Sequence, residues 1–155
     1  MAEKNNKCEQ LMLDNQLCFP LYVCAREIIN AYTPYLSEID LTYTQYITMM
    51  VMWEEKKVIT RHLRERLYLD SGTLTPVLKK LEKKGYITKE RSAEDARDLI
   101  VTITPEGEAL QKKAEDIPGK VGLCIRDFDK ALELRAMLRE MMEIFKENRI
   151  SNRKL

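Results

Sequence analysis

The sequence predicts a mostly α-helical protein that carries one small two-stranded β-element. Apolar residues recur at helical spacing over most of the 155 residues. Two short runs with alternating side chains, residues 86–91 and 99–104, are typical of strands. A short helix with several lysines on one face directly precedes them. Helix, turn, helix and a β-hairpin wing, in this order, form the winged helix-turn-helix arrangement that recognises duplex DNA.

The composition indicates one domain spanning residues 1–155. Hydrophobic residues make up 45% of the chain and charged residues 33%. The longest apolar runs fall short of the ~20 residues of a membrane span, and the first ten residues lack the apolar stretch of a signal peptide. Four cysteines without a CxxC pair, and one histidine, argue against a structural metal. We expect a soluble cytoplasmic protein without metal or cofactor.

An N-terminal helix is expected over residues 11–33. Asp14 or Asn15 can cap its start, and apolar residues follow at helical spacing. Pro20 predicts a kink or a later start. Pro34 is expected to end the helix, because the residue before a proline avoids the helical region.

The central part, residues 42–104, is expected to form the winged DNA-binding core. Thr42 and Gln45 form a capping-box motif that predicts a helix to about Glu55. Thr60 is expected to cap a second, shorter helix. These two helices precede the basic one.

The basic helix is expected to follow Asp70 and to end at Gly85. Its leucines recur at i, i+4 and i+7, so they form one apolar face. Residues 71–92 carry six basic and two acidic side chains, whereas residues 1–59 carry five basic and eight acidic ones. A local basic patch in a nearly neutral chain is typical of a phosphate-contacting surface. The residues expected to contact DNA are Ser71, Thr73, Thr75 and Lys79.

The loop between the two strands is long and charged, as expected for a projecting wing. Arg97 lies near its tip, with Asp95 two residues before it. An arginine at a wing tip can enter a narrow minor groove, with Asp95 as its support. The alternative is a surface ion pair of small energetic value.

A C-terminal helical region is expected over residues 105–148. Thr104 and Pro105 are typical of a helix start, and Pro118 with Gly119 is expected to interrupt the region. The winged core does not need the apolar stripes of residues 11–33 and 105–148 for its own packing. We therefore expect these two segments to form a homodimer.

Four segments resemble the MarR family of transcriptional repressors. They are DARDLIVTITPEG (95–107), NQLCFPLY (15–22), LTYTQY (41–46) and LYLDSGTLTPVLKKLEKKG (67–85). Within that family they are similar to the branch of organic hydroperoxide resistance regulators (OhrR). The resemblance implies a dimeric DNA-binding repressor, not an enzyme, that leaves double-stranded operator DNA when an organic hydroperoxide oxidises a thiol.

The resemblance also implies residue roles. Cys18 corresponds to the peroxide-reactive cysteine, and Tyr32 and Tyr43 to the tyrosines whose hydroxyls hold its sulfur. Cys124 is the candidate resolving cysteine, contributed by the partner chain. The recognition-helix residues named above and the wing residue Arg97 correspond to DNA-contacting positions. Pro20 and Cys24 depart from the family pattern.

Helix geometry separates Cys18 from Tyr32 within one chain. They are 14 residues apart, which is ~21 Å along a continuous helix, so the tyrosine of one chain is expected to reach the cysteine of the other. Cys24 lies ~9 Å from Cys18 along the helix, beyond disulfide reach. Cys8 stays open as a resolving thiol.

Two alternatives remain at this point. The first is a MarR-type repressor that responds to a small phenolic ligand, with structural cysteines. The second is a small thiol peroxidase that uses Cys18. The sequence supplies no arginine or base immediately beside that thiol, and a peroxidase leaves the DNA-binding half unexplained.

Overall fold

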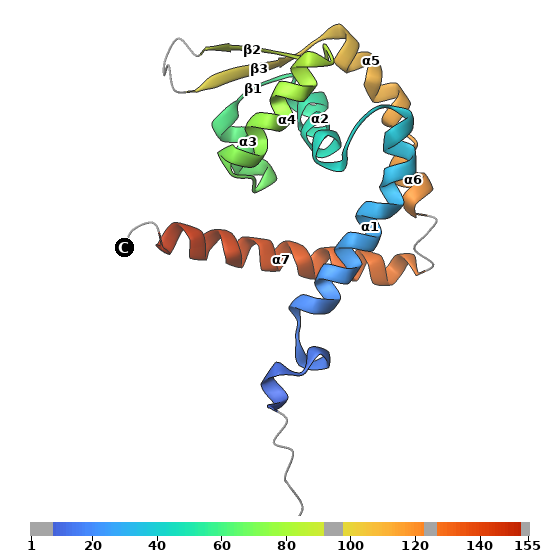
Figure 1. Cartoon of the computed structure of the whole chain (residues 1–155), viewed down its shortest axis with the longest axis vertical. Helices are drawn as coiled ribbons and strands as arrows, with labels where there is room; N and C mark the ends of the chain where they lie inside the picture. Colours follow the sequence, from blue (N-terminus) through green and yellow to red (C-terminus); the bar gives the residue numbers. More distant parts are fainter. Residues whose placement is uncertain (1–7, 92–97, 123–126, 153–155) are drawn as a thin grey trace, which may run out of the picture. The chain divides into compact units, whose positions relative to one another are not determined.

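The computed structural model describes residues 8–91, 98–122 and 127–152 of the chain (Figure 1). Contacts divide the chain into two compact units, Met1–Ile117 and Pro118–Leu155. The elements in chain order are η1 (Glu9–Leu11), η2 (Leu13–Asn15), α1 (Cys18–Glu38), α2 (Tyr43–Glu55), β1 (Lys57–Ile59), α3 (Thr60–Leu67), α4 (Ser71–Lys83), β2 (Ile87–Arg91), β3 (Leu99–Ile103), α5 (Pro105–Ala114), α6 (Ile117–Gly122) and α7 (Phe128–Asn152).

The predicted fold class is confirmed: the chain is mostly helical with a small antiparallel sheet. The sheet has three strands in the order β1-β3-β2, one more than the sequence predicts. The additional strand β1 pairs with β3, with Val58 opposite Val101. Both valines are buried, so β1 ties the end of α2 to the base of the wing.

The core of the first unit lies among α2, α3, α4 and the sheet, which gather together in Figure 1. The leucines predicted for the inner face of α4 are buried. A fully buried Leu, Met or Val contributes roughly 1.5–3 kcal/mol. The fully buried aliphatic residues of α2, α3, α4 and the strands are Met49, Met52, Leu63, Leu74, Leu81, Ile87 and Val101.

Side-chain caps determine where α2 and α5 begin, as predicted. Thr42 Oγ1 accepts from the backbone N–H of Gln45 at 3.4 Å, and Gln45 Oε1 accepts from the backbone N–H of Thr42 at 3.1 Å. Thr104 Oγ1 accepts from the backbone N–H of Gly107 at 3.0 Å. Each cap satisfies amides that the first helical turn leaves without partners.

Thr60 does not cap α3, so that prediction was wrong. The residue before the helix is Ile59, whose side chain makes no cap, and Thr60 is the first helical residue. Its Oγ1 instead accepts from the backbone N–H of Leu99 at 3.3 Å. The hydroxyl therefore joins α3 to strand β3, a tertiary contact that capping rules do not anticipate.

Helix α1 differs from its predicted bounds at both ends. It begins at Cys18, and Pro20 lies in its first turn, where a missing amide costs little. The later start was one of the two predicted outcomes. Pro34 does not end the helix, which continues to Glu38 and buries Leu36. Tertiary contact of this last stretch with α2 offsets the lost hydrogen bond.

The predicted break at Pro118 and Gly119 is also misplaced. Helix α5 ends at Ala114, and both residues lie inside α6. Pro118 is the second residue of α6, a position in the first turn that tolerates proline. Helix α7 begins at Phe128 and continues to Asn152, past the predicted end of the region at residue 148. Across the described ranges, none of the helices combines the length and apolar character needed to cross a membrane.

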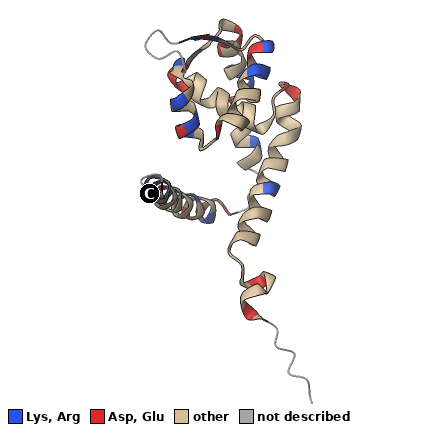
Figure 2. Ribbon diagram, turned by 60° about the vertical axis from the view of Figure 1, so that its left-hand side comes forward, with Lys and Arg blue, Asp and Glu red and all other residues tan. Residues whose placement is uncertain are grey.

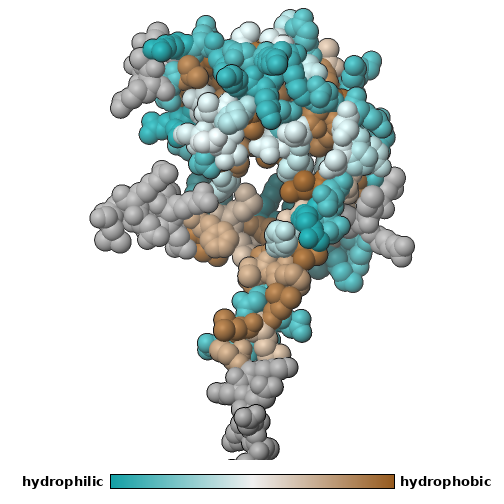
Figure 3. All heavy atoms as spheres, in the orientation of Figure 1, coloured by the Kyte–Doolittle hydropathy of each residue, from teal (hydrophilic) through white to brown (hydrophobic). Residues whose placement is uncertain are grey.

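Helices α1 and α7 carry large apolar side chains that are exposed in the single chain. Figure 3 shows brown, hydrophobic surface along the N-terminal part of α1. These faces fit the predicted dimerisation segments, and the dimer itself stays a prediction. The exposed apolar residues of the two helices and of the turn before α1 include Leu11, Leu13, Leu17, Phe19, Tyr22, Ile28, Phe128, Leu134, Met137, Ile144 and Phe145.

Candidate DNA interface and candidate thiol sensor

The predicted DNA-contacting residues of α4 all face solvent. The leucine face of the helix is anchored in the core, so the opposite face is presented outward. Lys and Arg positions recur on α3 and α4 (blue in Figure 2). The exposed residues of α4 include Ser71, Thr73, Thr75 and Lys79.

Asp70 determines the start of α4. Its Oδ1 accepts from the backbone N–H of Thr73 at 2.8 Å, and its Oδ2 accepts from the Thr73 hydroxyl at 2.9 Å. These bonds, the backbone one first, hold the pKa of Asp70 below its ordinary value of 3.8. Because the Thr73 hydroxyl hydrogen is committed to Asp70, Thr73 supports the helix start more than it offers a free donor.

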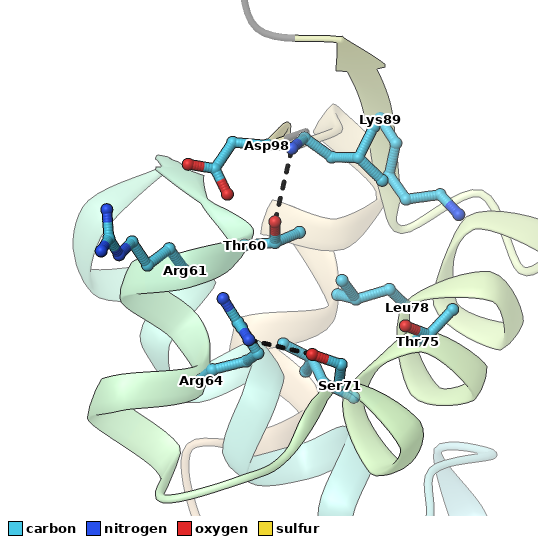
Figure 4. Close-up of a pocket in the computed structure, with 10 residues that line it drawn as sticks. Thr60, Arg61, Arg64, Ser71, Thr75, Leu78, Lys89 and Asp98 are labelled. Carbon is cyan, nitrogen blue, oxygen red and sulfur yellow. Dashed lines mark hydrogen bonds between the residues drawn. The ribbon is translucent and has the colours of Figure 1, made fainter. Parts of the chain in front are cut away.

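A groove of about 530 Å³ opens between α3, α4 and the wing strands (Figure 4). Its lining includes three leucines, three cationic side chains and one carboxylate. The lining residues are Thr60, Arg61, Arg64, Ser71, Leu74, Thr75, Leu78, Lys89, Asp98 and Leu99. Of the residues of α4 expected to contact DNA, Ser71 and Thr75 line this groove, whereas Thr73 and Lys79 do not.

Arg64 is held in this groove by the first residue of α4. Its Nη1 donates to Ser71 Oγ at 2.9 Å, and the dashed line in Figure 4 marks this bond. Lys89 forms an ion pair with Glu82 of α4, in which Nζ lies 2.9 Å from Oε2. A cation fixed beside the N-terminus of a helix, as Arg64 is here, suits a phosphate. The sequence interpretation missed Arg64, although Arg61 and Arg64 are three residues apart and so share one face of α3.

Three predicted site residues lie outside the described residues. They are Asp95 and Arg97 in segment 92–97, and Cys124 in segment 123–126. The wing segment joins strands in which Arg91 pairs with Leu99. The predicted roles of these three residues stay predictions.

Cys18 is the first residue of α1 and is exposed. Cys8 and Cys24 are exposed as well. Because α1 is one continuous helix from Cys18 past Tyr32, the two residues are ~21 Å apart along its axis. Tyr32 therefore does not reach the thiol of its own chain.

The structure brings Tyr32 and Tyr43 together, as the resemblance implies. Their ring centroids are 5.6 Å apart in an edge-to-face arrangement. The sequence interpretation missed Tyr46 as a member of this cluster. The ring centroids of Tyr46 and Tyr32 are 5.8 Å apart. Tyr43 and Tyr46 are three residues apart on α2, so their common face was readable from the sequence.

Burial raises the pKa of Tyr32, and the neighbouring Tyr43 raises it further. The pKa of Tyr46 is raised as well, first by burial and then by Tyr32 and Tyr43. Tyr32 and Tyr46 are therefore neutral phenols at neutral pH. A neutral phenol is a hydrogen-bond donor.

His62 belongs to an ion-pair cluster rather than a metal site. Its Nε2 lies 3.0 Å from the Glu55 carboxylate, which Arg66 also contacts. The His62 hydrogen bond is the main cause that lowers the pKa of Glu55. Within the described part of the chain, no group of three or more His, Cys, Asp or Glu residues is placed to hold a metal ion.

The helix-turn-helix with its three-stranded wing defines a winged DNA-binding protein. Residues 30–117 match the family of SarA/Rot transcriptional regulators. The chain is 41% identical over 139 residues to the organic hydroperoxide resistance transcriptional regulator of Bacillus subtilis, covering 89% of this chain and 95% of that protein. It is 42% identical over 145 residues to the HTH-type transcriptional regulator SarZ of Staphylococcus saprophyticus, covering 94% of each.

A solved structure of reduced AbfR bound to DNA is also similar. It is 33% identical, with a TM-score of 0.72, and covers 90% of this chain and 98% of that chain. The chain therefore belongs to the MarR/SarA family of winged helix-turn-helix transcriptional regulators, and it is a DNA-binding regulator. The prediction that it is not an enzyme is confirmed by this membership.

Proposed function

We propose that this regulator is a homodimeric repressor that releases its operator when an organic hydroperoxide oxidises Cys18. The observation that carries the proposal is the pair of phenols of Tyr32 and Tyr43, with ring centroids 5.6 Å apart, at the opposite end of α1 from the chain's own exposed thiol. Antiparallel packing of α1 against a second copy would bring Cys18 of one chain to these tyrosines of the other. Hydrogen bonds from two phenols favour the thiolate.

The proposed reaction is a two-electron oxidation of the sulfur. The Cys18 thiolate attacks the terminal oxygen of the hydroperoxide, an S–O bond forms and the O–O bond breaks. The alkoxide leaves and takes up a proton to give an alcohol. The products are the sulfenic acid of Cys18 and one molecule of alcohol.

Condensation with a second thiol then gives a disulfide and releases water. The candidate is Cys124 of the partner chain, on the strength of the family resemblance. Cys24 is a poor candidate, because it lies ~9 Å from Cys18 along α1. A low-molecular-weight thiol is the alternative if Cys124 does not take this role, and Cys8 remains open as well.

DNA release is proposed to follow from disulfide formation, because the bond would move α1 and the C-terminal helices. A dimer whose recognition helices match half-sites ~34 Å apart loses affinity when that spacing changes. The relative AbfR has been solved in an overoxidized form bound to DNA, and separately in a disulfide form. These forms support the disulfide, rather than the addition of oxygen to sulfur, as the releasing step.

The test is binding of the reduced protein to the DNA upstream of its own gene, with and without near-stoichiometric organic hydroperoxide. We expect tight binding that is lost on oxidation and restored by a thiol reductant. Cys18→Ser is expected to bind DNA and to ignore the oxidant. Release from Cys18→Ser would sink the proposal.

Two further variants and readouts separate the alternatives. Reversible release from Cys124→Ser would exclude Cys124 and leave a small-molecule thiol or Cys8 as the second thiol. If hydroperoxide does not change DNA binding by the wild-type protein, Cys18 has only a structural role. That result would favour a repressor that responds to small phenolic ligands. Sustained turnover of hydroperoxide with a thiol reductant would favour a peroxidase.

A further inference from the structure

Lys84 joins the recognition helix to the corner between α1 and α2, defined here as residues 39–45. It follows α4 directly as its C-cap. Its Nζ donates to the main-chain oxygen of Asp40, and it lies 2.9 Å from Asp40 Oδ2 and 3.4 Å from Gln45 Oε1. The three N–H donors of an ammonium group thus match three acceptors of one corner.

Two of the acceptors that hold Lys84, Gln45 Oε1 and the main-chain oxygen of Asp40, are themselves fixed by the fold. Gln45 is buried, and its Oε1 also accepts from the backbone N–H of Thr42 in the α2 capping box. Asp40 adopts a left-handed backbone conformation, with φ of 52°. The Lys84 side chain is 24% exposed and the Asp40 side chain is 82% exposed, so solvent screens the carboxylate contact, whereas the contact of Lys84 with the buried Gln45 is screened less.

The same corner adjoins the tyrosine cluster. Tyr43 is the first residue of α2 and lies between Asp40 and Gln45 in the sequence. Its ring contacts Tyr32 of α1. The corner therefore touches the proposed sensor tyrosines on one side and the end of the recognition helix on the other.

The other polar contacts of α4 described above, from Ser71 to Arg64 of α3 and from Glu82 to Lys89 of β2, stay within the winged core. The buried leucines of α4 hold it against the core, and hydrophobic contact is non-directional. Three hydrogen-bond acceptors aimed at one ammonium group fix a direction as well as a distance. The clamp formed by Lys84, Asp40 and Gln45 thus joins the end of α4 to the corner in a defined direction, so that a shift of the corner can rotate α4.

We propose that Lys84 is a positioning residue that couples the state of the sensor to the orientation of the recognition helix. This inference rests on the proposed function, since it requires an oxidation event that moves α1. When α1 moves, the corner moves, and Lys84 carries the end of α4 with it. Without the clamp, α4 keeps its place in the core but follows α1 less closely.

The test is the ratio of DNA dissociation constants for the oxidised and reduced forms, compared between wild type and Lys84→Met. Coupling between two sites usually changes affinity by about 5–150-fold. We expect the ratio measured for Lys84→Met to be at least about fivefold smaller than the wild-type ratio. Lys84→Arg keeps a hydrogen-bond donor of the same charge, and its ratio is expected to lie between those of Lys84→Met and wild type. The rate at which hydroperoxide consumes the Cys18 thiol is expected to stay at the wild-type value.

Two variants separate coupling from loss of charge or of stability. Lys56→Met removes a similar ion pair, Lys56 to Glu108 at 3.1 Å between the end of α2 and α5, and is expected to keep the wild-type ratio. Asp40→Asn removes one charge of the clamp and retains a residue that tolerates the left-handed conformation. It is expected to lower the ratio even if Lys84→Met folds poorly.

The outcomes distinguish this inference from the function on which it rests. A wild-type protein that keeps its DNA in the presence of oxidant would overturn the proposed function and the clamp with it. The clamp alone would be overturned if wild type releases DNA on oxidation and both Lys84→Met and Asp40→Asn show the same ratio of dissociation constants as wild type.

Discussion

Helices α1 and α2 are neighbours in the sequence and differ sharply in how much of each is buried. Seven of the 13 residues of α2 are buried in the single chain, whereas α1 buries one of its 21. Helix α2 is the centre of the winged core, and α1 presents an apolar surface to solvent. The DNA-binding core is thus complete within one chain, and α1 is not.

This difference separates two kinds of site. The exposed face of α4 and its groove are shaped by contacts inside one chain, so a protomer already presents them. The proposed thiol sensor requires groups that lie ~21 Å apart along α1. It is therefore expected to form only when a second copy packs against α1.

The largest expected effect tests the completeness of the core. Leu81 is fully buried and Leu17 is 66% exposed. Leu81→Ala is expected to cost about 2–5 kcal/mol of unfolding free energy, because it leaves a cavity. Leu17→Ala is expected to cost less than about 0.5 kcal/mol in the monomer, and more at concentrations where dimers form. Urea denaturation at two protein concentrations measures both. If Leu17→Ala and Leu81→Ala lose the same unfolding free energy at low protein concentration, α1 is packed within its own chain.

A second core test uses two glycines. A Cβ at Gly107 would lie 2.2 Å from the main-chain oxygen of Tyr86, whereas a Cβ at Gly119 would meet nothing within 4 Å. Gly107→Ala is expected to cost about 1–3 kcal/mol, because the neighbouring backbone must shift. Gly119→Ala is expected to be neutral or slightly stabilising.

Trp53 supplies the signal for this comparison. It is the only tryptophan, and its Nε1 donates to the Gly107 main-chain oxygen at 2.8 Å. Its fluorescence is expected to change in Gly107→Ala and to stay constant in Gly119→Ala. A fully stable Gly107→Ala with unchanged fluorescence would contradict the close approach of α5 to Tyr86.

A third prediction addresses the sensor tyrosines. Tyr32→Phe removes one proposed donor to the partner's thiolate and is expected to slow hydroperoxide consumption about tenfold, since a hydrogen bond to a charged group contributes roughly 1.5–3 kcal/mol. Tyr46 is 3% exposed in the same cluster. It is out of reach of a thiol from another chain, so Tyr46→Phe is expected to stay within about twofold of wild type. Loss of one thiol equivalent, followed over time, measures both. Equal slowing in the two variants would assign the effect to packing.

The sequence predicted the parts of the fold that depend on local signals. The capping box of Thr42 and Gln45, the Thr104 cap and the glycine after α4 all lie where the pattern places them. Such caps are made by residues three positions apart, so the sequence alone contains the whole interaction.

The errors concern elements that distant contacts determine. Pro34 is tolerated inside α1, where the helix end packs against α2. Strand β1 has three residues, too few for a pattern, and exists through its pairing with β3. Thr60 has the chemistry of a cap and is used instead to bind Leu99, 39 positions away.

The same division holds for the candidate site. The exposed face of α4 and the meeting of Tyr32 with Tyr43 were predicted, the first from periodicity and the second from resemblance. The bond from Arg64 to Ser71 and the clamp at Lys84 join side chains from different elements. Their geometry follows from the tertiary fold, so residue spacing in the sequence does not predict it.

The smallest expected effect compares how α1 and α4 begin. The residue before α1, Leu17, makes no side-chain cap, whereas Asp70 caps α4. The pKa of Asp70 is lowered by its bonds to Thr73, so its ionised form stabilises the folded chain. That contribution is present above the ordinary pKa of 3.8 and is lost as pH falls through the folded value.

Asp70→Ser retains a capping oxygen without a charge. Wild type is expected to melt higher than Asp70→Ser by no more than about 2 °C near pH 7. The difference is expected to shrink as pH falls below 3.8 and to be the same at all protein concentrations, because the cap lies within one chain. Thermal melting from pH 3 to 7 at two concentrations measures this. A difference that grows with protein concentration would show that the start of α4, like the proposed sensor, depends on the second copy.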